Sequence, residues 1–460
     1  MNSGIQVGLS SRRITPPVGT PMAGFAARTH PSVGVHDDLH ARALVVAAEE
    51  PHAAKTALVV VDVVGLSPEN TSAIREGIER TVGIPAAAVI VATTHTHGGP
   101  VTESRDEDSP ALRDYIEHLR NAVVACVADA TENMVPGRML LEFGDEATVG
   151  KNRRRPGGVI DPSVPTIRIE DMAGEVIGIM CCYACHPVTL GADNRMITAD
   201  YPGVVVRVLE AVYPEAVAIF ITGCAGQINT GHSAQDSLST RPSELRSFRE
   251  MIRLGTAIAG AAVQASEHAA DPRGTSRAVA PSPGIRAQVC AATVEVPAPL
   301  LPVEEPEAFR AMAAEWRARA ACPSLDGSPE AGGRLLRWAV WAERMAASAP
   351  HEPSIPLDVT VLRWGDICLV GLPGEPFVEF GLEIRRHAPA SVVVAGYANG
   401  CPGYVPHRSA YEEGGYEVLY AHRAAYSRPS AFAPEAGERL VAAALRSLEE
   451  LGPFPVDTDD

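Results

Sequence analysis

Continuous apolar runs rich in valine, isoleucine and alanine recur along this chain and constrain its fold more than any other feature. The clearest are Thr56–Val64 (TALVVVDVV), Ala88–Thr94 (AVIVATT) and Ala216–Thr222 (AVAIFIT). Runs this short and this β-branched are typical of buried strands. Segments with helical spacing, such as Asn70–Val82 and Pro110–Asn133, lie between them. The alternation predicts an α/β fold, a single large layered domain with mixed β-sheets flanked by helices.

The predicted domain spans residues 1–455, and residues 456–460 are expected to form a frayed tail. A chain of 460 residues is long enough to bury about three quarters of its unfolded surface in one core. The Ala/Arg/Glu-rich stretch at approximately 303–350 predicts a peripheral insertion of two helices, interrupted by the sequence CPSLDGSPEAGG.

Charge, hydropathy and cysteine content indicate which kinds of partner and which cellular compartment to expect. The chain carries 39 Lys+Arg against 56 Asp+Glu, a net charge of −17, which argues against a nucleic-acid partner. No apolar run reaches the 18 or so residues of a membrane span, so membrane insertion is not expected. The first residues lack an apolar signal segment, and nine scattered cysteines suit reduced thiols. We therefore expect a cytoplasmic protein that binds a small molecule; a homo-oligomer is compatible with the sequence.

Several common catalytic motifs are absent from the sequence. It contains no GxSxG, GxxxxGK[ST], GxGxxG or HExxH pattern. The sequence therefore gives no motif evidence for an α/β-hydrolase, a P-loop protein, a dinucleotide-binding protein or a zincin.

Two histidines follow a predicted strand directly, in the sequence THTHGGP. In an extended chain residues i and i+2 share a face, so His95 and His97 are expected to point the same way. Gly98 and Gly99 then predict a tight turn with exposed backbone N–H groups. A histidine pair at a strand end is compatible with a metal site and also with ordinary surface or core histidines.

Two further candidates follow predicted strands: His186 in YACHPVTL and Glu375 in LPGEPF. Taken singly, His186 also fits a hydrogen-bonded core histidine, and Glu375 fits a carboxylate at a helix start. Together with His95 they form a His₂Glu set, which is typical of catalytic zinc sites that keep an open position. Tyr404 and Tyr416 lie in tyrosine-rich loops that simple packing would also explain.

The order of these motifs resembles the catalytic domain of the neutral/alkaline non-lysosomal ceramidase family. The resemblance covers nearly the whole chain and implies the fold of that domain, in a short form without the family's C-terminal immunoglobulin-like domain. The segments that carry it are ITPPVGTPMAGF, HDDLHARALVV, THTHGGP, KNRRRP, YACHPVTL, ITADYPG, LPGEPF and GYVPHRSAYEEGGYEV.

The resemblance implies one catalytic zinc ion per chain. His95, His186 and Glu375 match the family's ligands, and Tyr404 matches the tyrosine that completes the site. Tyr416 matches a tyrosine that steadies the oxyanion.

Other positions match residues beside the scissile amide. His97 is one, and an arginine of the run Asn152-Arg153-Arg154-Arg155 is another. Arg153 is the first choice because it follows Asn152 as in the family, with Arg155 as the alternative.

A second set of candidates concerns support and substrate contact. Asp200, in ITADYPG, is expected to orient His186, and Asp62 at the end of VVVD is a similar candidate. Gly98 and Gly99 are further candidate substrate contacts.

One position departs from the family pattern. Where the family carries a serine, assigned as a nucleophile or substrate contact, this chain has Asn229, in GCAGQINT. An amide cannot act as an acyl-accepting nucleophile, so Asn229 remains only a candidate substrate contact. Cys224 is nearby, but apolar neighbours would raise its pKa. We therefore expect attack by metal-activated water without a covalent acyl-enzyme.

These features predict a zinc-dependent hydrolase that cleaves an amide of a small polar substrate. The arginine run in an acidic protein predicts an anionic substrate, held by Arg153 through its planar guanidinium. The alternatives are a lactone, ester or lactam hydrolase that uses the same zinc, and a non-catalytic metal-binding protein.

Overall fold

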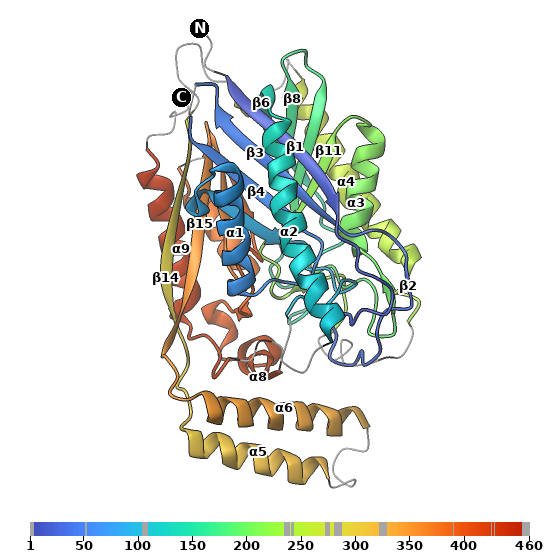
Figure 1. The fold of residues 1–460 in the computed structure, drawn as a ribbon, viewed down its shortest axis with the longest axis vertical. Coiled ribbons are helices and arrows are strands. Elements are labelled where there is room, and N and C mark those ends of the chain that lie inside the picture. The colour runs from blue at the N-terminus through green and yellow to red at the C-terminus, as the bar shows by residue number, and fades with distance from the viewer. Residues whose placement is uncertain are drawn as a thin grey trace.

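A computed structural model describes residues 4–452 except 51–52, 104–108, 234–239, 241–242, 272–276, 280–287, 322–328, 390, 425 and 427. The predicted tail at 456–460 and part of the link between the two helices of the insertion lie outside these residues. Figure 1 shows strands in the middle of the molecule and helices on the outside, the α/β class that the sequence predicts.

Two mixed sheets form the centre of the described part of the chain. The large one has the strand order β11-β9-β8-β6-β1-β3-β4-β5, with β13 paired to β6, and the small one has the order β14-β15-β16-β18. The strands of the large sheet are β1 (Ile5–Arg13), β3 (His40–Ala48), β4 (Lys55–Val61), β5 (Val89–Thr93), β6 (Val135–Asp145), β8 (Ser163–Asp171), β9 (Val176–Tyr183), β11 (Val217–Thr222) and β13 (Arg277–Val279). Those of the small sheet are β14 (Val289–Pro299), β15 (Ser354–Trp364), β16 (Ile367–Gly371) and β18 (Ser391–Ala395).

Three short strand pairs complete the described sheets. They are β2 (Gly34–Val35) with β10 (Met196–Ile197), β7 (Lys151–Asn152) with β12 (Ile228–Asn229), and β17 (Glu375–Pro376) with β19 (Tyr404–Val405).

Helices cover the outer faces of both sheets, which gives four layers. α1 (Pro68–Val82), α2 (Pro110–Glu132), α3 (Asp200–Val212) and α4 (Phe248–Ala270) pack on the large sheet, and α7 (Val378–His387) and α9 (Glu435–Glu450) pack on the small one.

Side-chain alternation in the strands separates these layers. In β3, Ala43 and Val45 face α1 and α2, whereas Leu44 and Val46 join a core between the two sheets. Both faces of the large sheet are therefore buried, which explains why its strands are apolar without interruption.

The large sheet curls until its two edge strands meet. The hydroxyl of Thr222, at the end of β11, donates to the carbonyl of Thr94, just after β5 (2.7 Å). The N–H of Gly396, just after β18 of the small sheet, donates to the carbonyl of Thr222 (3.0 Å). The carboxyl ends of strands from both sheets thus converge at one place, the position at which α/β proteins build sites.

The predicted insertion is a helical hairpin of α5 (Pro306–Ala320) and α6 (Pro329–Ser348), which lies across one end of the molecule (Figure 1). Its own small core contains Phe309, Trp316 and Trp341. The hairpin contacts α8 (Ala421–Ala424) and the π-helical turn η4 (Tyr416–Tyr420), where Trp338 stacks on Tyr420 (ring centroids 6.0 Å apart).

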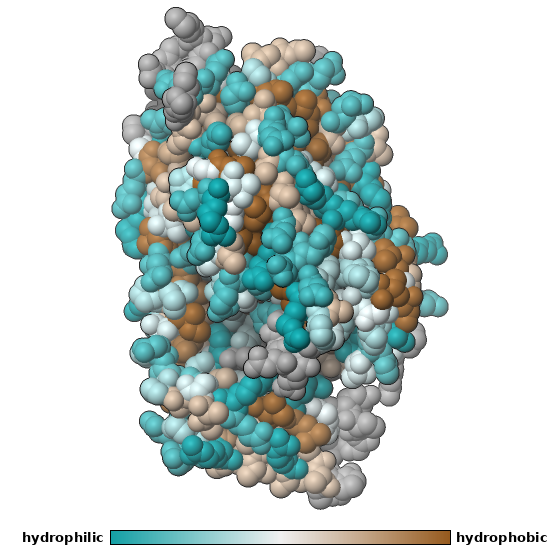
Figure 2. Space-filling model, viewed as in Figure 1, coloured by the Kyte–Doolittle hydropathy of each residue, from teal (hydrophilic) through white to brown (hydrophobic). Residues whose placement is uncertain are grey.

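Within the described residues, no helix combines the length and apolar character that a membrane crossing requires. The face drawn in Figure 2 is mainly hydrophilic, with small separate groups of hydrophobic residues.

Candidate metal centre and active site

Short segments after the converging strands carry the polar residues of the site. His95 follows β5, His186 follows β9, and Glu375 and Tyr404 begin β17 and β19. β17 and β19 pair in parallel, with Glu375 opposite Tyr404. The topology therefore brings together four residues that are far apart in sequence.

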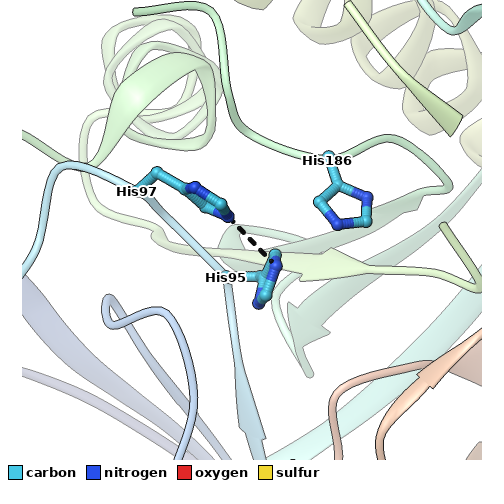
Figure 3. Close-up of side chains that lie close together, drawn as sticks. All are labelled: His95, His97 and His186. Atoms are coloured by element: carbon cyan, nitrogen blue, oxygen red, sulfur yellow. Dashed lines mark hydrogen bonds between the residues drawn. The ribbon is translucent and has the colours of Figure 1, made fainter. Parts of the chain in front are cut away.

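Three imidazole rings face one another at this point (Figure 3). Nitrogen atoms of His95, His97 and His186 lie within 4.8 Å of one another. Nε2 of His97 is 3.2 Å from Nε2 of His95. Oε2 of Glu375 lies 2.8 Å from Nε2 of His186 and 3.5 Å from Nε2 of His95. The site thus offers three imidazoles and one carboxylate. The group of three includes His97, which the family resemblance placed beside the scissile amide.

The hydrogen bonds of these rings leave lone pairs pointing at one another. Nδ1 of His186 lies 2.6 Å from the carbonyl oxygen of Ala225, and Nδ1 of His95 contacts the carbonyl of Val64. A carbonyl only accepts, so each Nδ1 carries the proton and each Nε2 presents a lone pair. The lone pair of His186 then faces an oxygen of Glu375, and a cation between the two would satisfy both groups. These residues fit a divalent metal ion.

Burial keeps the imidazoles neutral. Burial lowers the pKa of His95 to about 4, and burial together with the nearby Arg153 lowers the pKa of His186 to about 3. Burial and the two neighbouring imidazoles also lower the pKa of His97 well below its usual value. A metal ligand must be the neutral imidazole, so all three rings are in the binding form at neutral pH.

The turn that presents His95 is not the extended chain that the sequence predicted. β5 ends at Thr93, and His95 has φ of 62° in the left-handed region. Tyr397 and Asn399, on the neighbouring loop, also adopt the left-handed conformation, with φ of 53° each. Such non-glycine conformations are costly and concentrate at functional sites. His95 and His97 therefore meet through a strained turn and not through strand periodicity.

Two tyrosines that sequence reasoning missed complete the surroundings of the metal group. Tyr397 stacks on His95 (ring centroids 4.3 Å apart), and its hydroxyl lies 3.3 Å from Nδ1 of His186. The hydroxyl of Tyr426 donates to Oε1 of Glu375. A carboxylate whose second oxygen is fixed in this way keeps the first directed at the imidazoles. The sequence holds no motif signal for either tyrosine.

The structure places Tyr404 beside His186 and Tyr416 against Tyr404. The hydroxyl of Tyr404 is 3.5 Å from Nε2 of His186, and the ring of Tyr416 packs edge-on against it (centroids 5.8 Å apart). Tyr416 is 39% exposed. It can therefore meet a substrate that approaches from solvent.

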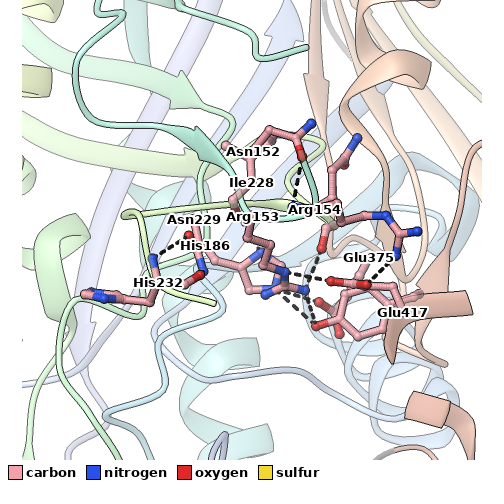
Figure 4. A network of polar contacts seen from close by, with 12 residues as sticks. Asn152, Arg153, Arg154, His186, Ile228, Asn229, His232, Glu375 and Glu417 are labelled. Atoms are coloured by element: carbon pink, nitrogen blue, oxygen red, sulfur yellow. Dashed lines mark hydrogen bonds and ion pairs between the residues drawn. The ribbon is translucent and has the colours of Figure 1, made fainter. Parts of the chain in front are cut away.

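Arg153 lies beside the site, but its charge is already balanced (Figure 4). Its guanidinium donates to Glu417 (2.8 Å), to the hydroxyl of Tyr404 (3.0 Å) and to the carbonyl of Gly226 (2.8 Å). Burial lowers the pKa of Arg153, but Tyr404 and Glu417 outweigh this effect and raise it. The expectation of a free cation that holds a substrate anion is therefore wrong for Arg153. The alternative, Arg155, is 58% exposed and pairs with Glu413.

Asn229 and the two glycines have local structural contacts. The amide of Asn229 closes a turn, because its oxygen accepts from the N–H groups of Gly231 and His232 and its nitrogen donates to the carbonyl of His232. The N–H of Gly98 donates to the hydroxyl of Thr96. A Cβ at Gly98 would lie 2.4 Å from the carbonyl oxygen of Thr198, so this glycine permits close packing.

The carbonyl of Gly99 accepts from the N–H of Ala23 (3.0 Å), but a Cβ at Gly99 would lie no nearer than 3.4 Å to its neighbours, so packing does not require a glycine there. The contacts of Gly98 and Asn229 thus explain their presence without a substrate.

The expectation that Asp200 orients His186 is wrong. The carboxylate of Asp200 accepts from the N–H groups of Tyr201 and Leu190, whereas backbone carbonyls orient the ring of His186. Asp62 is also engaged elsewhere, since it accepts from the N–H of His40.

Residues 5–236, half of the chain, match the sequence profile described as "Neutral/alkaline non-lysosomal ceramidase, N-terminal". His95, His97, Arg153 and His186 lie inside this match, and Glu375 lies outside it.

Curated relatives and a solved structure agree with this profile. The chain is 28% identical to the neutral ceramidase of Drosophila melanogaster over 232 residues and 23% identical to that of Oryza sativa subsp. japonica over 229. These alignments cover 45% and 44% of this chain but only 32% and 28% of the relatives.

The crystal structure of neutral ceramidase from Pseudomonas aeruginosa superimposes with a TM-score of 0.74 at 19% identity. The superposition covers 100% of this chain and 76% of that one, and it shows a shared fold. On the profile match, this chain belongs to the neutral/alkaline non-lysosomal ceramidase family.

Proposed function

We propose that this chain is a zinc-dependent hydrolase that cleaves an amide bond of a small, polar substrate, with water as the nucleophile. The observation that supports this is the lone pair of His186 facing the carboxylate of Glu375, beside His95 and His97. The curated relatives are named neutral ceramidases, and ceramide is an N-acyl amide, so an amide is the first choice of bond.

The chain's own residues would hold the metal, stabilise the developing negative charge and position the ligands. A zinc ion held by His95, His186, Glu375 and Tyr404 would polarise the scissile carbonyl and make a water acidic enough to ionise near pH 7. The exposed phenol of Tyr416 would donate to the carbonyl oxygen as its negative charge develops. Arg153 would keep Tyr404 in place through its hydrogen bond to the hydroxyl.

A substrate panel with and without metal tests this proposal. Purified protein is assayed on N-acyl amino acids, simple amides, lactones and esters, after chelation and after zinc is restored. We expect amide cleavage that chelation removes and zinc restores. A preference for lactones or esters would favour the alternative hydrolase, and turnover unchanged by chelation would refute the zinc mechanism.

Replacing Tyr416 by phenylalanine should lower kcat/KM by about 100-fold, the usual loss for one oxyanion donor. The zinc content should stay unchanged, since the hydroxyl of Tyr416 has no contact with the imidazoles in the described structure. Tyr420→Phe is the matched control, because Tyr420 lies on the same π-helical turn but stacks on Trp338. Equal kinetics for the two variants would remove Tyr416 from the mechanism.

Replacing Cys224 by alanine should leave most of the activity. Cys224 is buried against Gly381, and burial raises the pKa of its thiol, which disfavours the nucleophilic thiolate. Steady-state kinetics and intact-protein mass after exposure to substrate check this result. A mass increment on Cys224, or loss of turnover with zinc still bound, would instead indicate an acyl-enzyme.

A further inference from the structure

A buried arginine lies close to the metal group and has no balancing charge in the described structure. Arg428 is only 6% exposed, and its guanidinium carbon lies 4.0 Å from the centroid of the Phe432 ring. Its backbone is held independently of the side chain. The N–H donates to the carbonyl of His422 (3.3 Å), and the carbonyl accepts from the indole of Trp341 (2.9 Å).

The guanidinium of Arg428 lacks acceptors. Nε and Nη1 are buried without a hydrogen-bond partner, and no carboxylate among the described residues lies within ion-pair distance. Burial lowers its pKa to about 9. A buried charge without a partner costs several kcal/mol of folding free energy. Packing alone therefore does not explain an arginine at this position.

Two other arginines near the site have more of their hydrogen-bonding groups satisfied than Arg428 has. Arg153 is paired with Glu417, as described above. Arg28 donates from Nη1 to the carbonyls of Ala23 and His97 (2.8 and 2.9 Å). Arg428 therefore differs from Arg153 in making no ion pair among the described residues, and from Arg28 in leaving two buried guanidinium nitrogens, Nε and Nη1, without a partner where Arg28 leaves only Nε.

The neighbours of Arg428 connect it to the metal group. Tyr426, two residues earlier, donates to Glu375. A Cβ built on Gly403 would lie 2.9 Å from Nη2 of Arg428 and 2.8 Å from the Tyr426 ring. The guanidinium thus lies against the residue that precedes Tyr404. Gly403, with φ of 122°, is required there both by its backbone conformation and by this close approach.

We propose that Arg428 binds a carboxylate of the substrate and so selects anionic amides. This inference rests on the proposed amide hydrolase and replaces Arg153 with Arg428 as the cation that recognises the substrate. A guanidinium presents a planar pair of donors that matches a carboxylate, and the match is strongest where water is excluded. Binding of the anion would supply the charge and the acceptors that Arg428 lacks.

The test compares N-acetyl amino acids with their primary amides, which differ only in the carboxylate. Wild type should prefer the acids in kcat/KM. Arg428→Met should lower kcat/KM for the acids about 10- to 100-fold while that for the amides stays within about 2-fold. Arg428→Lys should recover part of the preference. Arg408→Met, which removes an exposed arginine paired with Glu438, should change neither value.

A thermal-melt measurement separates this inference from the proposed function. An N-acetyl amino acid should raise the Tm of wild type but not that of Arg428→Met, and its primary amide should raise neither. Without ligand, Arg428→Met should melt no lower than wild type, because it removes an unpaired buried charge.

Failure of the proposed hydrolase and failure of the carboxylate site give different results. Arg428-dependent stabilisation by the acid without any amide hydrolysis would refute the proposed function and leave the carboxylate site in place. Hydrolysis of acids and amides with equal kcat/KM, unchanged in Arg428→Met and Arg428→Lys, would overturn the carboxylate site and leave the hydrolase in place.

Discussion

Replacing His95 and His186 together by alanine is expected to remove the bound zinc, from about one ion per chain to none, and to reduce hydrolysis to background. Of the four proposed ligands only Glu375 and Tyr404 would remain, too few to hold a zinc ion tightly. The fold should persist, because the two rings follow the ends of β5 and β9 and are not part of the strands.

Metal analysis of the purified variants and their far-UV circular dichroism check this prediction. His268→Ala is the control, because His268 is exposed in the last turn of α4 and should leave the zinc content unchanged. A folded double variant that retains full zinc would show that the metal binds elsewhere.

The sequence was sufficient to predict the fold class because the large sheet is buried on both faces. β4, β5 and β11 lie between helices and a second sheet, so their sequences are apolar throughout and read clearly as strands. The order of the strands could not be predicted in this way. The meeting of β11 with β5 depends on the curl of the whole sheet, which local patterns do not encode.

The residues of the site also differ in how well the sequence predicts them. His95, His186 and Glu375 each follow a readable strand, so their convergence could be proposed from sequence. Glu417 lies in a π-helical turn and Arg428 in irregular chain, and neither segment has a periodic pattern, so each charge looks like that of a solvated residue. The errors on Arg153 and Asp200 have the same cause, because a motif identifies a residue but not the partner that it meets in the fold.

Replacing Glu417 by glutamine is expected to lower the free energy of unfolding by about 3–5 kcal/mol, the usual cost of breaking a buried ion pair from one side. The Glu417 side chain is only 2% exposed and accepts from Arg153 (2.8 Å) and Arg154 (2.7 Å). Glutamine would leave Arg153 without a countercharge and Arg154 with only the partly exposed Glu413 (3.3 Å). It would also turn an amide N–H₂ toward the donors of both guanidinium groups.

Glu413 provides the matched control for this change. It is 35% exposed and pairs with the exposed Arg155 and, at 3.3 Å, with Arg154, which keeps its shorter ion pair with Glu417 when Glu413 is replaced. Glu413→Gln should therefore cost less than about 1 kcal/mol. Denaturant unfolding followed by fluorescence measures both variants. A second change, Arg154→Met in the Glu417→Gln background, should recover part of the loss, since it removes one of the two guanidinium groups that Glu417 neutralises.

The pH dependence of stability gives an independent check on Glu417. Burial raises the pKa of its carboxyl, but Arg153 and Arg154 outweigh this and lower it below the ordinary value. A carboxylate with a lowered pKa in the folded state contributes its full stability above the pKa of the unfolded chain, about 4.3, and loses it as the pH falls further. The difference in unfolding free energy between wild type and Glu417→Gln should therefore be constant from about pH 6 to 8 and shrink below about pH 4. If it equals that of Glu413→Gln throughout, the buried arginines are balanced by something other than Glu417.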